Sequence, residues 1–152
     1  MIAIYRYYDC AKEYQEGARL DSYNLTDAKA YSGTFSGWDG FYYTLGNISG
    51  GFSPANGAAI TVLRYHSTGE GKEIFAFVSD DGKSFIGTIS DEDENSFKVT
   101  RDDGAYSTIT IEGSTLKTAN DSTSTVIINN LTDATPRDAL ATILSQGYEL
   151  PQ

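Results

Sequence analysis

Residues 97–111 read FKVTRDDGAYSTITI, two short runs of β-branched and aromatic side chains on either side of Asp102-Asp103-Gly104. This pattern is typical of a β-hairpin, and a glycine after two turn residues favours a three-residue loop. Such a loop pairs Phe97 with Ile109 on one face, whereas a two-residue loop would place Ile109 opposite Lys98. Because a one-residue slip turns every side chain to the other face, the apolar pattern selects the three-residue loop.

The same pattern extends over residues 58–111, where turn sequences separate five apolar runs. The runs cover residues 58–67, 73–79, 85–90, 97–101 and 105–111. Asp80-Asp81-Gly82 is a second link of the same kind and pairs Phe77 with Phe85. Residues 73–79 are apolar at alternate positions on both faces, which indicates a strand covered on both sides. A sandwich, a closed barrel or a sheet with a helix on its second face would provide that environment.

The chain before this meander is harder to assign. Residues 2–8 are typical of a strand, and residues 9–31 predict a short helix followed by irregular chain. Trp38-Asp39-Gly40 repeats the hairpin link, predicting a hairpin over 33–45 that pairs Phe35 with Tyr43. Residues 46–57 hold four glycines and predict a long loop.

After the meander, residues 114–120 and 126–128 predict two more strands, and the chain then carries its strongest local helix signal. Thr135 is placed to cap a helix, Pro136 fits the first helical position and Gly147 is placed to end it. We expect this helix to cover an apolar sheet face or to plug the end of a barrel.

These elements predict a mainly β fold: an antiparallel meander of about eight to ten strands forming a barrel or two-layer sandwich, with a short C-terminal α-helix. We expect residues 1–152 to form a single domain. Within it, residues 1–32 would hold the N-terminal strand and short helix, 33–131 the β core and 135–147 the helix.

The charge layout excludes one class of partner. The formal net charge is −10, and residues 68–104 contribute −6 of it, with ten acidic and four basic side chains. Such a surface repels phosphate backbones, so nucleic-acid binding is not expected. The acidic turns either keep the protein soluble and protect its strand edges, or meet a protein partner that is basic. Self-assembly is the other expected association.

The sequence predicts no catalytic residue, metal or cofactor. His66 and Cys10 are the single histidine and cysteine, and no Gly-x-Ser-x-Gly elbow is present, so a catalytic triad or a zinc site of usual ligands is not expected. Asp91, Asp93 and Asn95 have the alternating spacing of a calcium loop but lack its glycine and its final glutamate. A hydrolase with paired carboxylates is a third-ranked alternative.

Two sets of residues are candidates for binding. Eight of the eleven tyrosines precede residue 44, and aromatic side chains with a polar group are enriched in binding hot spots. Trp38 is expected to be exposed at the first position of a hairpin loop. The candidate binding residues are the aromatic Tyr5, Tyr7, Trp38 and Tyr42 and the acidic Asp91, Glu92, Asp93 and Glu94.

The order of elements resembles lipocalin-like barrels, with hairpins in a meander, an early Gly33-x-x-x-Gly37-Trp38 and a late helix. Those families place a Gly-x-Trp near the first strand, whereas here Gly37 directly precedes Trp38. The resemblance implies a ligand cavity, which Phe75, Phe77, Phe85 and Ile89 would line.

The leading prediction is a non-catalytic protein-interaction or assembly module with an acidic surface. It would be a structural or virion-like protein, or an inhibitor of a basic partner. A small-molecule-binding barrel of lipocalin-like architecture is the alternative. No apolar run approaches the length of a membrane span and residues 1–6 lack signal-peptide features, so cytoplasmic synthesis without membrane association is expected.

Overall fold

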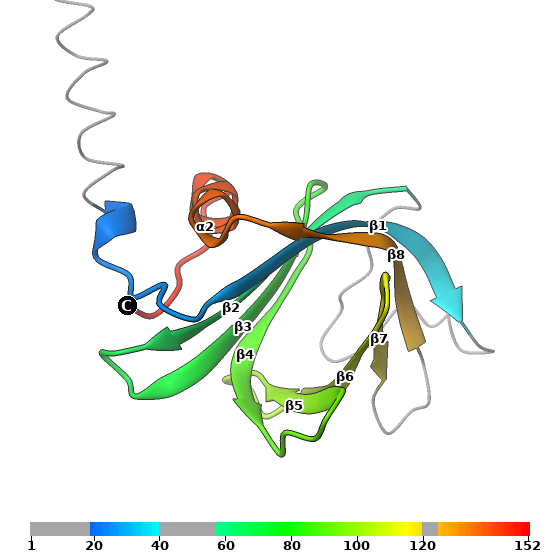
Figure 1. The fold of residues 1–152 in the computed structure, drawn as a ribbon, viewed down its shortest axis with the longest axis horizontal. Helices are drawn as coiled ribbons and strands as arrows, with labels where there is room; N and C mark the ends of the chain where they lie inside the picture. Colours follow the sequence, from blue (N-terminus) through cyan, green and yellow to red (C-terminus); the bar gives the residue numbers. More distant parts are fainter. Residues whose placement is uncertain (1–18, 40–56, 120–124) are drawn as a thin grey trace, which may run out of the picture.

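The computed structural model describes residues 19–39, 57–119 and 125–152, and within these ranges eight antiparallel strands close into a barrel (Figure 1). Each strand pairs with the next in sequence, and β8 returns to pair with β1. The strands are β1 (Lys29–Asp39), β2 (Ala59–Ser67), β3 (Lys72–Ser79), β4 (Ser84–Ser90), β5 (Ser96–Thr100), β6 (Tyr106–Glu112), β7 (Thr115–Ala119) and β8 (Thr125–Ala134), followed by helix α2 (Pro136–Ser145). The predicted mainly β fold with a C-terminal helix is confirmed, and its form is a barrel.

Both Asp-Asp-Gly links form three-residue turns that end in a left-handed glycine. Gly82 has φ +88° and Gly104 has φ +87°, a region in which glycine has no steric penalty. In the second turn the Arg101 amide donates to the carbonyl of Ala105 at 2.8 Å, closing the loop. Phe97 therefore lies opposite Ile109, which confirms the predicted register.

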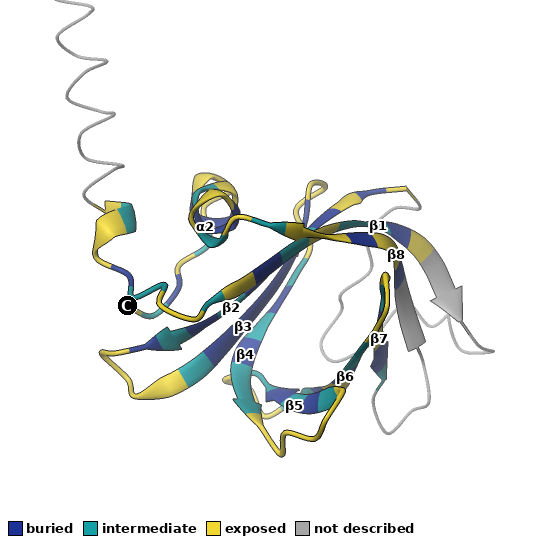
Figure 2. Ribbon diagram, in the orientation of Figure 1, coloured by how far each residue is buried: buried dark blue, intermediate teal, exposed yellow. Residues whose placement is uncertain are grey.

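Large side chains fill the inside of the barrel. Phe77 lies opposite Phe85, as predicted, and the Phe75 ring packs on Phe77 at 6.3 Å and edge-on against Phe97 at 5.5 Å. Each of the eight described strands contributes buried residues to this interior, and Figure 2 shows buried segments along the strands. An eight-stranded barrel is just wide enough for side chains to fill it, so this interior is a packed core.

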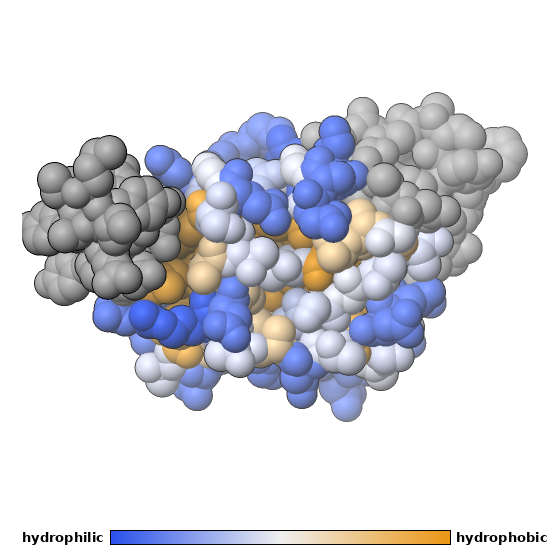
Figure 3. Space-filling view, turned by 90° about the horizontal axis from the view of Figure 1, so that it is seen from above, coloured by the Kyte–Doolittle hydropathy of each residue, from blue (hydrophilic) through white to orange (hydrophobic). Residues whose placement is uncertain are grey.

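A second apolar cluster lies on the outer face of β1, β2 and β3. Ile74, Ala76 and Val78 point outward from β3, and Leu140 and Ile143 of α2 belong to the same buried cluster. Residues 73–79 are therefore covered on both faces, as predicted, and the helix covers a sheet face instead of plugging the barrel end. Figure 3 views the α2 side, where apolar atoms emerge among the coloured residues only in small areas between hydrophilic ones.

The residues after α2 are tied to the barrel by two buried tyrosines. The Tyr23 hydroxyl donates to the carbonyl of Leu150 at 2.8 Å, and the Tyr65 hydroxyl donates to the carbonyl of Pro151. Burial raises the pKa of both hydroxyls above the ordinary tyrosine value, because the charged phenolate would lose its hydration. Both groups therefore remain donors at neutral pH.

Helix α2 begins and ends close to the predicted positions. Pro136 is its first residue, and Gly147, with φ +92°, lies just beyond its C-terminus. Thr135 has the extended backbone of an N-cap, but its side chain makes no capping hydrogen bond. The predicted position of Thr135 is confirmed, and a side-chain cap from it is absent.

The hairpin predicted around Asp39-Gly40 is wrong at Phe35. The Phe35 amide donates to the carbonyl of Ala58 at 2.9 Å, and on its other side Phe35 lies opposite Ile128. With neighbours on both sides of its strand, Phe35 has no position left for the predicted pairing with Tyr43. Local turn sequence suggested a hairpin here, whereas barrel closure gives this segment two distant neighbours.

The limits of the barrel also differ from the predicted 33–131. Strand β1 begins at Lys29, and β8 extends to Ala134. Residues 19–21 are helical, within the span where a short helix was predicted. The predicted strand over 2–8 and the glycine-rich loop over 46–56 lie outside the described residues.

Candidate functional site

One end of the barrel opens into a hollow of about 160 Å³, which we call the barrel mouth. Its floor is aromatic and aliphatic, formed by Tyr31, Val62, Phe75, Phe97 and Ile111. Its rim comes from the turn between β4 and β5, over residues 92–96, and Lys29 and Arg64 complete the lining. The mouth thus combines an apolar floor with charged groups of both signs.

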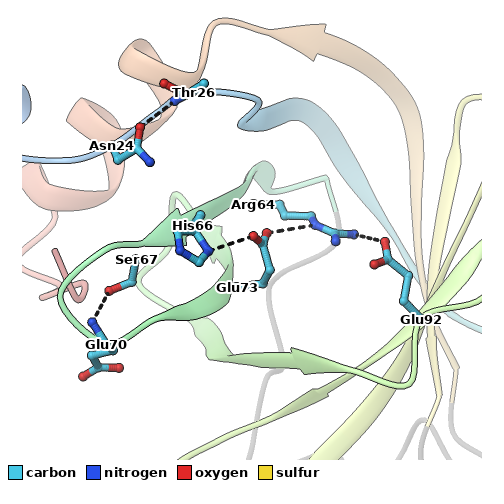
Figure 4. A network of polar contacts seen from close by, with 8 residues as sticks. All are labelled: Asn24, Thr26, Arg64, His66, Ser67, Glu70, Glu73 and Glu92. Atoms are coloured by element: carbon cyan, nitrogen blue, oxygen red, sulfur yellow. Dashed lines mark hydrogen bonds and ion pairs between the residues drawn. The ribbon is translucent and has the colours of Figure 1, made fainter.

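Arg64 is the central side chain of the mouth. It alternates with the core residue Val62 along β2 and is directed into the barrel end, where its guanidinium lies 5.1 Å from the centroid of the Phe97 ring. Its Nη1 lies 2.7 Å from Oε1 of Glu92, and its Nε lies 3.6 Å from Oε2 of Glu73 (Figure 4). One guanidinium therefore connects β2, β3, the β4–β5 turn and an aromatic ring of β5.

Glu73 also contacts His66, the next inward position of β2 after Arg64. The Nδ1 atom of His66 lies 3.1 Å from Oε1 of Glu73, and the two residues are register partners across the β2–β3 hairpin. The sequence analysis did not predict this contact between His66 and Glu73. The hairpin register of residues 66 and 73 would have revealed the pair. Among the described residues, no hydroxyl or thiol is hydrogen-bonded to His66.

The ion pair between Arg64 and Glu92 changes the acidity of both groups. The hydrogen bond from Arg64 lowers the pKa of Glu92 below the ordinary glutamate value, because it stabilises the charged carboxylate. The same contact raises the pKa of Arg64. Both shifts indicate that the ionised pair is the stable form at neutral pH.

Three of the four acidic candidates, Glu92, Asp93 and Glu94, line the rim of the mouth, and Asp91 directly precedes them in the turn. Asp91, Glu92, Asp93 and Glu94 are all exposed, and Asp91 has φ +50° in the tight turn. Within the described ranges, Glu92 is paired with Arg64, whereas Asp93 and Glu94 form no ion pair. With Lys29, Arg64 and Glu73 included, two cations and four carboxylates (Glu73, Glu92, Asp93 and Glu94) give the mouth a formal charge of −2.

The aromatic candidates are not placed in this way. Tyr5, Tyr7 and Tyr42 lie outside the described residues, and so does the side chain of Trp38. The backbone of Trp38 belongs to β1 and lies opposite Val126, so Trp38 is a strand residue. The prediction that it occupies the first position of a hairpin loop is therefore wrong, because β1 continues to Asp39 by pairing with β8.

Across residues 19–39, 57–119 and 125–152, no cluster of three or more His, Cys, Asp or Glu side chains is arranged to hold a metal ion. In the same part of the chain, no helix has the length and hydropathy needed to cross a membrane. The side chains that line the barrel mouth include charged and aromatic groups.

Arg64→Gln is expected to raise the pKa of Glu92 toward the ordinary glutamate value. Because Arg64 lowers that pKa in the folded protein, their contact stabilises the fold above the ordinary pKa and is lost as pH falls through the lowered one. A carboxyl NMR titration between pH 2 and 7 measures the change directly. Arg137→Gln is the matched control, since it removes an equal charge from an exposed pair with Asp21 on the α2 side. An unchanged pKa of Glu92 in Arg64→Gln would contradict the assignment.

Comparisons with protein-family models, with curated proteins and with solved structures found no match for this chain.

Proposed function

We propose that this protein is a non-catalytic interaction module whose barrel mouth receives a basic side chain of a protein partner. The observation that carries this proposal is the union, in one hollow, of an aromatic floor with a surplus of carboxylates. Carboxylates attract an ammonium or guanidinium group, and an aromatic face adds a cation–π contact. The formal net charge of −10 would also speed the approach of a basic partner.

Arg64 supports the choice of a cation as the guest. Its guanidinium already lies over Phe97 and against Glu92, an arrangement that suits a positively charged planar group. Glu73 and Glu92 are occupied by Arg64, which leaves the exposed carboxylates of Asp93 and Glu94 to meet an incoming cation. Of the acidic surface expected from the sequence, Asp93 and Glu94 are therefore the two side chains that would contact the partner.

The size of the mouth favours a single side chain over a whole organic ligand. Its volume is about 160 Å³. Sites for drug-sized ligands span about 300–1,000 Å³. A lysine or arginine side chain fits the smaller space, with its alkyl stem on the floor and its charge at the rim.

A small-molecule-binding barrel is the second candidate, because closed eight-stranded barrels are able to hold one small ligand. All four residues predicted to line its cavity belong to the core or pack against it: Phe75, Phe77 and Phe85 are buried there, and Ile89 is partly buried against them. Only Phe75 of the four also lines the mouth. A fluorescent apolar dye that binds the unmodified protein but not the Phe75→Trp variant would favour this candidate. Dye fluorescence unchanged by added protein would count against it.

The test of the proposal uses hexalysine as the basic probe and hexaglutamate as its opposite. NMR titration of the ¹⁵N-labelled protein should shift amides of residues 91–97 and of Arg64 with hexalysine only. Asp93→Asn with Glu94→Gln is expected to weaken hexalysine binding by about tenfold, because two rim charges contribute on the order of 0.5–1 kcal/mol each. Added salt should weaken binding of the unmodified protein more than binding of this variant.

The matched control is Asp21→Asn with Asp80→Asn, which changes the net charge equally while leaving the mouth intact. Asp80 is exposed in the β3–β4 turn, at the other end of β4 from the rim, and Asp21 pairs with Arg137 on α2. Equal weakening by both double variants would show a general charge effect and would reject the mouth as the site.

A further inference from the structure

Strand β4 has one edge that is only partly paired. It pairs with β3 from Ser84 to Thr88, but with β5 only from Thr88 to Ser90. The described strands therefore leave Ser84–Ile86 with a strand neighbour on one side alone, whereas Gly87 lies against the backbone of Thr100 in β5. Such a row of main-chain groups is a template for pairing with another chain.

The register shows which main-chain groups face this open side. The Ser79 amide donates to the carbonyl of Lys83 at 2.8 Å, so this pair exchanges ladder hydrogen bonds with the strand opposite. Hydrogen-bonded and non-hydrogen-bonded pairs alternate in an antiparallel ladder. The main-chain N–H and C=O groups of Phe85 therefore point toward β3, whereas those of Ser84 and Ile86 point away from it. Both are half-exposed, and no described residue hydrogen-bonds their outward main-chain groups.

A hollow of about 340 Å³ lies beside this edge, on the outer face of the barrel. Its apolar lining includes Ile74, Ile86 and Leu150, and its carboxylates are those of Glu70, Asp102 and Glu149. The Ile86 side chain points outward into this hollow from the same residue whose main chain is unpaired. Main-chain donors and a side-chain pocket therefore coincide at one position.

We propose that the β4 edge binds an extended segment of a protein partner, which adds as a strand alongside Ser84–Ile86 and places a lysine or arginine opposite Ile86. Cross-strand neighbours project their side chains to the same face, so the residue opposite Ile86 enters the hollow. Its alkyl stem lies on Ile74 and Leu150, and its charge meets the three carboxylates. Main-chain hydrogen bonds to Ser84 and Ile86 supply affinity, and the hollow supplies specificity.

This surface is separate from the barrel mouth. The mouth is rimmed by the β4–β5 turn at one end of β4, whereas the unpaired edge lies at the other end, next to the β3–β4 turn. The two sites share no lining residue. Each can therefore fail without the other, and variants of one serve as controls for the other.

The experiment titrates the full chain with the extended peptide acetyl-Thr-Val-Lys-Val-Thr-amide. Three control peptides differ from it by one change each. One carries glutamate in place of lysine. The first N-methylated peptide carries methyl groups on the alternate amides that face the protein, and the second carries them on the other amides. We expect the lysine peptide to shift the amides of residues 84–88 and to slow hydrogen exchange at Ser84 and Ile86. The glutamate peptide and the first N-methylated peptide should bind at least about tenfold more weakly, because each loses a charge contact or the ladder hydrogen bonds.

Two protein variants separate this site from the mouth. The double variant Glu70→Gln with Glu149→Gln is expected to weaken binding of the lysine peptide at residues 84–88 by about tenfold. The double variant Asp93→Asn with Glu94→Gln should change binding at residues 84–88 by less than about twofold. Failure of the lysine peptide to bind, equal binding of all four peptides, or shifts confined to residues 91–97 would each overturn the proposal. The last outcome would leave the mouth as the site for basic side chains.

Discussion

Phe75→Ala is expected to lower the free energy of unfolding by about 3–5 kcal/mol, the largest effect of any single change considered. The Phe75 side chain is 1% exposed and packs on the rings of Phe77 and Phe97 at the centre of the barrel interior. Removing the ring leaves a cavity that the surrounding strands cannot fill, because closure of the barrel through β1 and β8 limits their movement.

Urea denaturation followed by tryptophan fluorescence measures this loss, with the midpoint expected to fall and the slope to remain constant. Phe75→Leu keeps most of the volume and should cost less than half as much. Equal stability of Phe75→Ala and the unmodified protein would show that Phe75 does not lie in a close-packed core.

Gly87→Ala is expected to cost about 2–3 kcal/mol, at the upper end of the range for overpacking. A Cβ atom on Gly87 would lie 2.4 Å from the carbonyl oxygen and 2.7 Å from the carbonyl carbon of Thr100. Because these are backbone atoms of the neighbouring strand β5, no side-chain rotation can relieve the contact. The β4 and β5 backbones must move apart, which should also weaken their short pairing over Thr88–Ser90.

The matched control is Gly69→Ala in the β2–β3 turn, where an added Cβ would meet its nearest neighbour at 3.5 Å, an ordinary contact. This control should change stability by no more than about 1 kcal/mol, with stabilisation expected from the reduced freedom of the unfolded chain. Thermal and urea midpoints of the two variants provide the measurement. A Gly87→Ala protein as stable as Gly69→Ala would refute the close approach of the two strands.

Much of the fold could be predicted because the relevant forces act over short stretches of chain. The register of Phe97 with Ile109 follows from the length of one turn and the alternation of side chains, and both are local properties. The apolar pattern on both faces of residues 73–79 likewise indicated two covered sides. The start of α2 at Pro136 and the left-handed Gly147 beyond its end follow from the conformations that these two residue types favour.

The candidate site was predictable only in part. Asp91–Glu94 stood out as an acidic turn, and the structure places Glu92, Asp93 and Glu94 at the rim of the barrel mouth. Arg64 gave no such signal, because a single arginine in a β-strand is ordinarily a solvated residue on the outer face. Its inward position follows from its alternation with Val62, but its contacts with Glu92 and Phe97 depend on how far the β4–β5 turn folds over the barrel end.

The sequence by itself determined the registers of the two Asp-Asp-Gly hairpins, the doubly covered strand β3, the C-terminal helix and the acidic turns, because each depends on neighbours within about 15 residues. Tertiary structure decided the closure of β1 on β8, the partner of Phe35, the Arg64 cluster and the unpaired edge of β4. These features join segments that lie far apart in the chain. Their pairing depends on strand twist and on the space left by packed side chains, which no local pattern encodes.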